Sequence, residues 1–123
     1  MKKFFLWFVF LLCSCQREIS IPSDREFVLK QTNPPITIVF NQTENRFAGF
    51  GGVNRYFGQY KTDGNSLTLS HVGATMMMGS PKDMENERLY FETLGEITSF
   101  EITDNTLILK SPTKTLIFTP KEN

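Results

Sequence analysis

The chain has 123 residues, with 13 basic and 13 acidic side chains, one histidine and two cysteines, and 40% of its residues are hydrophobic. A chain of this length buries one core rather than two. Its balanced charge and its lack of a Lys/Arg cluster argue against nucleic-acid binding, because such binding depends on cationic contacts to phosphates.

The first fifteen residues have the pattern of a bacterial lipoprotein signal. Two lysines precede an apolar run of nine residues, Phe4 to Leu12. This run is too short to span a bilayer as a helix, which takes roughly 20 residues, and is typical of a secretory signal. The run ends in Leu-Cys-Ser-Cys, which resembles a lipobox. We therefore predict a signal peptide over residues 1–14 and lipidation of Cys15, with Cys13 as the alternative acceptor.

Cleavage at this point would change the chemistry of the chain. Removing residues 1–14 from the 123 leaves 109 residues with 11 basic and 13 acidic side chains, a formal charge near −2. The remaining cysteine would be a lipid thioether, so no intrachain disulfide could form. The only tryptophan, Trp7, would be lost. More than one acyl chain gives stable membrane attachment, and Gln16 after the lipidated cysteine favours the outer membrane, with the domain facing the periplasm or the cell surface.

The rest of the chain alternates period-2 segments with turns, which predicts an antiparallel meander of about seven or eight short strands. Polar residues 15–26 are predicted to form a tether, and residues 27–120 the domain. Asp63-Gly64 between two such segments predicts a tight hairpin. The predicted strands follow in chain order: FVL (27–29), ITIVF (36–40), RFAGF (46–50), RYFGQY (55–60), SLTLS (66–70), TSFEI (98–102), TLILK (106–110) and TLIFT (115–119).

One segment has helical rather than strand periodicity. Ser80, followed by a proline and then an acidic residue, is typical of a helix N-terminus, and Gly95 is a predicted C-cap. We predict a helix over about 81–95 with an apolar sector made of Met84, Tyr90, Phe91, Leu94 and Ile97. Glu87 falls inside that sector. Because a buried carboxylate without a partner is costly, either Glu87 reaches the rim of an oblique helix or another group pairs with it.

The stretch GFGGVNRYFGQY, residues 49–60, contains four glycines. A dinucleotide-binding loop needs G-x-G-x-x-G at a strand-to-helix junction, whereas here the third glycine is absent and a strand pattern follows. We interpret these glycines as allowing a strand to bend or another backbone to approach closely.

This stretch resembles the G-x-x-G-C-N-R-[FY]-x-G-x-Y signature of the META domain family, which includes bacterial heat-shock lipoproteins of the HslJ type. A second family motif, T-[RK]-M-A-C-x-x-x-x-M-x-x-E-x-x-[FY]-x-x-x-L, is similar to the segment that begins at Thr75 and ends at Leu94. The chain departs from the family at both motif cysteines, where it has Val53 and Gly79. If these cysteines pair in relatives, the chain has lost the disulfide as a unit, and no redox or metal role exists at these positions.

The resemblance implies an α+β fold, mainly antiparallel β, in which one helix packs across a strongly curled, barrel-like sheet. It also suggests partners for Glu87. Asn54, Arg55 and Glu87 match polar positions of the family, and we expect them to form a structural polar cluster in which Glu87 accepts hydrogen bonds from Asn54, from Arg55 or from amides of the glycine-rich bend.

The sequence indicates no catalytic or metal site. His71 is the only histidine and has no recognisable Ser/Asp partner, and no His/Cys/Asp cluster has metal-ligand spacing. Glu85, Glu92 and Glu96 are predicted to form the solvated face of the helix. Residues 76–78 are all methionine, a pattern that is compatible with soft-metal binding or with a surface that contacts a partner. Strand alternation would instead pack one side of this triplet in the core. We expect no enzyme activity and no cofactor.

Three functions are consistent with the sequence. The first is a non-enzymatic outer-membrane lipoprotein that serves envelope integrity or stress tolerance through contacts with another envelope protein. This rests on the family's association with heat shock and novobiocin resistance. The second is a module that binds a small hydrophobic ligand in an apolar cleft formed by Tyr56, Tyr60, Phe91 and Phe100. The third is an inhibitor or pilot of another envelope protein. We expect a monomeric domain.

Overall fold

The computed structural model describes residues 20–122, which form eight strands and one helix. The predicted signal peptide and the lipidation site Cys15 lie outside the described residues. The elements are β1 (Glu26–Leu29), β2 (Thr37–Asn41), β3 (Arg46–Phe50), β4 (Arg55–Asp63), β5 (Ser66–Ala74), α1 (Pro81–Glu96), β6 (Ser99–Thr103), β7 (Thr106–Lys110) and β8 (Thr115–Pro120).

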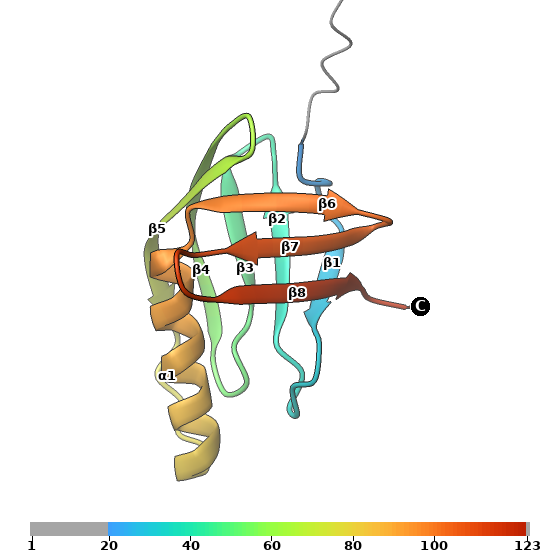
Figure 1. The fold of residues 1–123 in the computed structure, drawn as a ribbon. Coiled ribbons are helices and arrows are strands. Elements are labelled where there is room, and N and C mark those ends of the chain that lie inside the picture. The colour runs from blue at the N-terminus through green and yellow to red at the C-terminus, as the bar shows by residue number, and fades with distance from the viewer. Residues whose placement is uncertain (1–19, 123) are drawn as a thin grey trace, which may run out of the picture.

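The strands form a closed antiparallel barrel in sequence order, and β1 pairs with β8 to close it (Figure 1). The predicted curled sheet of seven or eight strands with one helix is confirmed. The hairpin predicted from Asp63-Gly64 is the long hairpin of β4 and β5. Its turn lies one residue further along, at Gly64-Asn65, because Asp63 still pairs with Ser66, and Gly64 has the positive φ of 61° that this turn requires.

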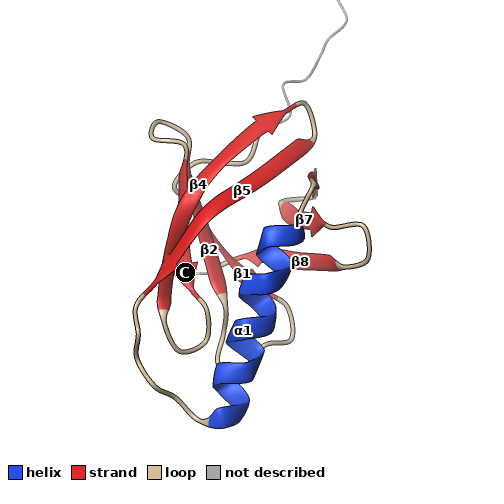
Figure 2. Cartoon of the chain, turned by 90° about the vertical axis from the view of Figure 1, so that its left-hand side faces the viewer, coloured by secondary structure: helices blue, strands red, loops and turns tan. Residues whose placement is uncertain are grey.

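The barrel is weakest between β5 and β6, which share a single register pair, Ser66 with Ser99. Beyond this pair the two strands diverge, and α1 lies beside β5 where they separate (Figure 2). The helix therefore closes the side of the barrel that the sheet leaves incomplete.

The alternating apolar residues predicted to share a face do so. Ile36, Ile38 and Phe40 are all at most 5% exposed and lie in one core with residues from every strand and from the helix. Gly49 allows β3 to lie close to the paired strand β2, because a Cβ at this position would lie 2.0 Å from the Thr37 carbonyl oxygen. This is the close backbone approach proposed for the glycine-rich stretch.

Two boundaries differ from the sequence prediction. The packed domain begins before residue 27, since Ile21 is buried and Ser23 forms a bridge with Phe40. The helix begins after the predicted cap, where the Ser80 hydroxyl accepts a hydrogen bond from the Asp83 amide. It runs through Gly95, however, and ends at Glu96 with Ile97 in an extended conformation. Gly95 is therefore not the C-cap, because the chain leaves α1 directly into an extended segment rather than through a left-handed residue.

Candidate functional site

A buried polar cluster joins α1 to the glycine-rich bend. Glu87 is 4% exposed. Its Oε2 accepts hydrogen bonds from the amides of Val53 (2.9 Å) and Asn54 (2.6 Å), and its Oε1 accepts one from Asn54 Nδ2 (2.7 Å). These are two of the three kinds of partner proposed for Glu87 from the sequence. Both oxygens of the carboxylate therefore have hydrogen-bond donors, which offset the cost of burying its charge in the apolar sector of the helix.

Asn54 extends this cluster to the connection between β5 and α1. Its Oδ1 accepts from the Met77 amide (2.6 Å) and from the Thr75 hydroxyl (2.9 Å), and its Nδ2 also donates to the Met77 carbonyl oxygen (3.3 Å). One buried side chain thus fixes the backbone of residues 75–77. Within residues 20–122, leaving aside residues 71 and 72, every buried side-chain nitrogen and oxygen has a hydrogen-bond partner.

Arg55 does not join Glu87. It is exposed and bonds to Thr75 through its backbone, since its amide donates to Thr75 Oγ1 (3.2 Å) and its carbonyl oxygen accepts from the Thr75 amide (3.0 Å). Asn54, the residue before β4, is buried, whereas the side chain of Arg55, the first residue of β4, is exposed to solvent.

The residues predicted to form an apolar cleft lie in the core instead. Tyr56, Tyr60 and Phe100 are at most 5% exposed, and the half-buried Phe91 packs on Tyr56 with ring centroids 5.3 Å apart. Three of these side chains belong to the hydrophobic core and the fourth packs against it, so they do not line the predicted cleft.

A buried tyrosine pair stands at the centre of this region. The Tyr56 and Tyr90 hydroxyls are 2.6 Å apart, and the Tyr56 hydroxyl also donates to the Thr37 carbonyl oxygen at 2.6 Å. Burial raises the pKa of both phenols, and for Tyr56 the neighbouring Tyr90 adds to the rise. The two neutral phenols thus join α1 to β2 and β4.

A groove lies beside α1. It has a volume of about 510 Å³ and is lined by four segments: the helix, Leu116 of β8, the chain from Leu29 to Ile36, and Gly51-Gly52 of the glycine-rich bend. Its apolar lining residues are Leu29, Pro34, Ile36, Leu89, Tyr90 and Leu116. Its polar lining residues include Gln31, Thr32, Asn33, Lys82, Asp83, Asn86 and Thr93. This volume is within the range of small-molecule sites, roughly 300–1,000 Å³.

The methionine triplet is on the surface. Met76, Met77 and Met78 are 94%, 63% and 86% exposed. The expectation that one side of the triplet packs in the core is wrong, because β5 ends at Ala74 and strand alternation no longer applies. In both views the connection from β5 to α1 runs beside the start of the helix (Figures 1 and 2). This connection lies at one end of the barrel, and residue 20, where the described chain starts, lies at the other.

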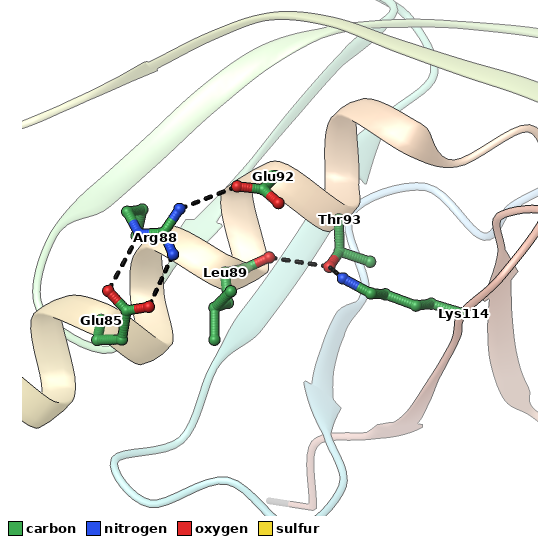
Figure 3. A network of polar contacts seen from close by, with 6 residues as sticks. All are labelled: Glu85, Arg88, Leu89, Glu92, Thr93 and Lys114. Atoms are coloured by element: carbon green, nitrogen blue, oxygen red, sulfur yellow. Dashed lines mark hydrogen bonds and ion pairs between the residues drawn. The ribbon is translucent and has the colours of Figure 1, made fainter.

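The outer face of α1 is charged and paired within itself. Arg88 contacts both carboxylate oxygens of Glu85 (2.7 and 3.0 Å) and one oxygen of Glu92 (2.9 Å), as Figure 3 shows. The hydrogen bond from Arg88 lowers the pKa of Glu85. One turn later, Lys114 of the β7–β8 connection reaches the Thr93 hydroxyl at 3.5 Å (Figure 3). Glu85 and Glu92 are the solvated carboxylates that the sequence predicted, and Glu96 is exposed as well.

The described residues contain no group of three His, Cys, Asp or Glu side chains that could hold a metal ion. The side chain of His71 lies outside the described part of the structure. Among residues 20–122, α1 is not long and apolar enough to cross a bilayer.

The profile of the META domain matches residues 22–123. The chain belongs to the META domain family. No curated protein matches its sequence significantly. The META assignment agrees with the sequence resemblance. In the structure the segments of the two motifs meet where Glu87 binds Val53 and Asn54.

Solved structures share the fold. An NMR structure of a protein from Burkholderia xenovorans is 23% identical, has a TM-score of 0.69, and matches 82% of this chain and 84% of that one. A second NMR structure is 26% identical with a TM-score of 0.63, over 79% of this chain and 89% of that one. A crystal structure of a DUF4847 family protein from Bacteroides vulgatus is 16% identical with a TM-score of 0.55, over 72% and 60% of the two chains.

The two positions that depart from the META motifs are neighbours in space. A Cβ built on Gly79 would lie 2.8 Å from Val53 Cγ2 and 3.5 Å from Val53 Cβ. The side chain of Val53 therefore fills the space between these two positions. Both departures are visible in the sequence, but their contact depends on the fold and could not be predicted from it.

Sequence reasoning missed the groove entirely. Its lining comes from four segments, and the only local signal was the apolar Leu89 outside the predicted apolar sector of the helix.

Proposed function

We propose that this META domain is the binding domain of an outer-membrane lipoprotein, anchored through Cys15, that serves envelope integrity or stress tolerance through contact with another envelope protein. The proposal includes no catalytic step. The observation that carries it is the exposed methionine triplet, residues 76–78, on a backbone fixed by Asn54. Methionine is flexible and polarizable, and it is common at surfaces that contact proteins.

The position of the triplet favours a protein partner over the membrane. The described chain starts at one end of the barrel, and the triplet lies at the other (Figure 1). A domain held by a lipid at its N-terminus would therefore carry these methionines on the side away from its anchor. Exposed apolar side chains at this end are suited to a partner that approaches from the periplasm or from outside the cell.

Site-specific crosslinking tests this contact. A photo-crosslinking residue replaces Met78 in the full acylated chain, and the matched control carries it at Phe57, which is 58% exposed on β4. The expected result is a protein adduct from position 78 in intact membranes that position 57 does not give. The adduct should also disappear when Met76 and Met77 are changed to serine. Adducts that are the same from both positions, or adducts with lipid only, would contradict the proposal.

The anchor has its own test. Cys15→Ser should abolish acylation and release the protein from membranes, whereas Cys13→Ser should leave both unchanged. The mature protein should also show no tryptophan fluorescence, because Trp7 precedes the proposed cleavage site. The opposite response of the two cysteine variants would identify Cys13 as the acceptor.

The groove beside α1 supports a second candidate, the binding of a small hydrophobic ligand. Its apolar lining and its volume of about 510 Å³ favour this function. A hydrophobic dye should bind the wild-type protein, and a fatty acid should displace it. Leu116→Gln, within the groove, should weaken dye binding, whereas Ile117→Gln, at an exposed neighbouring position, should not. Equal effects of both variants would argue against the groove.

An inhibitor or pilot of another envelope protein would give the same crosslink. The activity or the sorting of the captured partner, measured with and without this protein, distinguishes this role.

A further inference from the structure

The four methionines within residues 20–122 differ in their exposure to solvent. Met76, Met77 and Met78 are 94%, 63% and 86% exposed, whereas Met84, in the first turn of α1, is partly buried. The protein therefore presents three adjacent thioethers to solvent and shields a fourth, eight residues from the first of them.

The exposed methionines contribute little to holding their own segment in place. The backbone of Met77 is held at both its amide and its carbonyl by Asn54. On one side Thr75 bonds to Asn54 and to the Arg55 backbone, and on the other the Ser80 hydroxyl caps α1. The segment thus keeps its conformation through polar contacts that do not involve a sulfur atom.

Exposed thioethers react with two-electron oxidants such as hydrogen peroxide. A sulfur lone pair attacks one peroxide oxygen and the O–O bond breaks. The transferred oxygen stays on sulfur as a sulfoxide, and its proton passes to the leaving hydroxide, which departs as water. The sulfur is oxidised by two electrons and the peroxide is reduced by two. The product is polar, and methionine sulfoxide reductases can reverse it.

We infer that Met76, Met77 and Met78 form an oxidation site for peroxide-class oxidants, at which an apolar surface becomes polar while the barrel stays folded. Because the methionine sulfur atoms lie outside the core and outside the Asn54–Glu87 cluster, their oxidation leaves the contacts that hold the fold unchanged. If the proposed contact with a partner is correct, this reaction weakens it, and this last step rests on the proposed function.

The site is tested on the full chain treated with increasing hydrogen peroxide, with sulfoxide mapped by peptide mass spectrometry. Met76 and Met78 should oxidise first, followed by Met77, and Met84 should react at least about five-fold more slowly because its sulfur is less accessible. The melting temperature should stay unchanged once the triplet is fully oxidised. Oxidation of Met84 at the same rate, or a fall in melting temperature that accompanies oxidation of the triplet, would overturn the inference.

A leucine variant separates oxidation from contact. In M76L/M77L/M78L the surface stays apolar but cannot form sulfoxide, and M84L is the matched control. With the crosslinker at the exposed position of Ala74, two residues before the triplet, peroxide should abolish the partner crosslink of the wild-type protein and of M84L. It should spare the crosslink of the triple variant. A crosslink lost equally in the triple variant would refute the switch. If untreated protein gives no crosslink, the proposed function fails, while the mass mapping still decides the oxidation site.

Discussion

Cysteines at positions 53 and 79 should form a disulfide that stabilises the domain. The Cβ positions of Val53 and Gly79 are 3.5 Å apart, at the lower end of the range found in disulfides, about 3.5–4.5 Å. Positive φ among the described glycines is confined to Gly52 and Gly64, so a side chain at position 79 meets no backbone penalty. The double substitution V53C/G79C therefore places two thiols within bonding reach without moving the backbone.

The size of the effect follows from the loop that the bond would close. Residues 53–79 make a loop of 27 residues, and the loss of chain entropy in the unfolded state then gives about 3.5 kcal/mol. For a domain of about 100 residues this corresponds to a rise in melting temperature on the order of 15 °C or more. Gly79→Cys alone should do the opposite, because its new Cβ would lie 2.8 Å from Val53 Cγ2.

The assay compares oxidised and reduced V53C/G79C in a C13S/C15S background, which removes the native thiols. Thermal unfolding followed by circular dichroism should show the higher melting temperature only in the oxidised form, and thiol titration should find no free cysteine in it. The reasoning is refuted if both thiols remain titratable after oxidation, or if the oxidised protein melts no higher than the reduced protein.

Three further predictions concern the core and its polar cluster. Glu87→Gln and Glu87→Ala should each lower the free energy of unfolding by about 1–4 kcal/mol, because glutamine replaces one of the two acceptor oxygens by a donor and alanine removes both. In denaturant titrations the exposed control Glu92→Gln should stay within about 0.5 kcal/mol of wild type, and equal behaviour of the two sites would contradict the assigned role. Gly49→Ala should prevent normal folding, since its Cβ would lie 2.0 Å from a β2 carbonyl oxygen. Gly95→Ala, inside α1 with nothing within 4 Å of the new Cβ, should instead stabilise the protein by roughly 0.5–1 kcal/mol. Soluble yield and melting temperature measure both effects, and a tolerated alanine at position 49 would be inconsistent with the close approach of β3 to β2. Burial raises the pKa of all three tyrosines, so the folded protein binds these phenol protons more tightly than the unfolded chain does. The stability of the protein should therefore be intact below pH about 10 and fall as the pH rises above it. An ultraviolet titration that finds all three phenols ionising normally in folded protein would disprove this.

The strands were predictable because their side chains alternate with period 2 and their turns carry strong local signals. Asp63-Gly64 and Asp104-Asn105 mark two hairpins, and the residues of the second turn have the positive φ typical of such turns. Helical periodicity places Glu87 in the apolar sector of α1, and the cost of an unpaired charge leaves two alternatives, a position at the rim or burial with a partner. The structure shows the second, since Glu87 is 4% exposed. Which donors would reach it depended on how β4 and α1 meet, which only the family resemblance suggested.

The remaining errors share a physical cause, which is that period rules fail where an element ends. Met77 was placed by strand alternation, yet β5 stops at Ala74. Gly95 was assigned as a cap because glycine is common there, although an extended residue can end a helix equally well. The groove could not be predicted because its lining brings together residues from both ends of the sequence, such as Leu29 and Leu116.

The closure of the barrel has a consequence for how the chain folds. Every other strand pairing joins neighbours in sequence, whereas the closing pair joins Phe27 with Pro120. Hairpins of neighbouring strands can form early at a small cost in loop entropy, but the closing pair brings together the two ends of the domain. We therefore expect β1 and β8 to meet late. If the N-terminus is attached to the membrane as proposed, the folding chain would keep an open sheet edge until its last strand arrives.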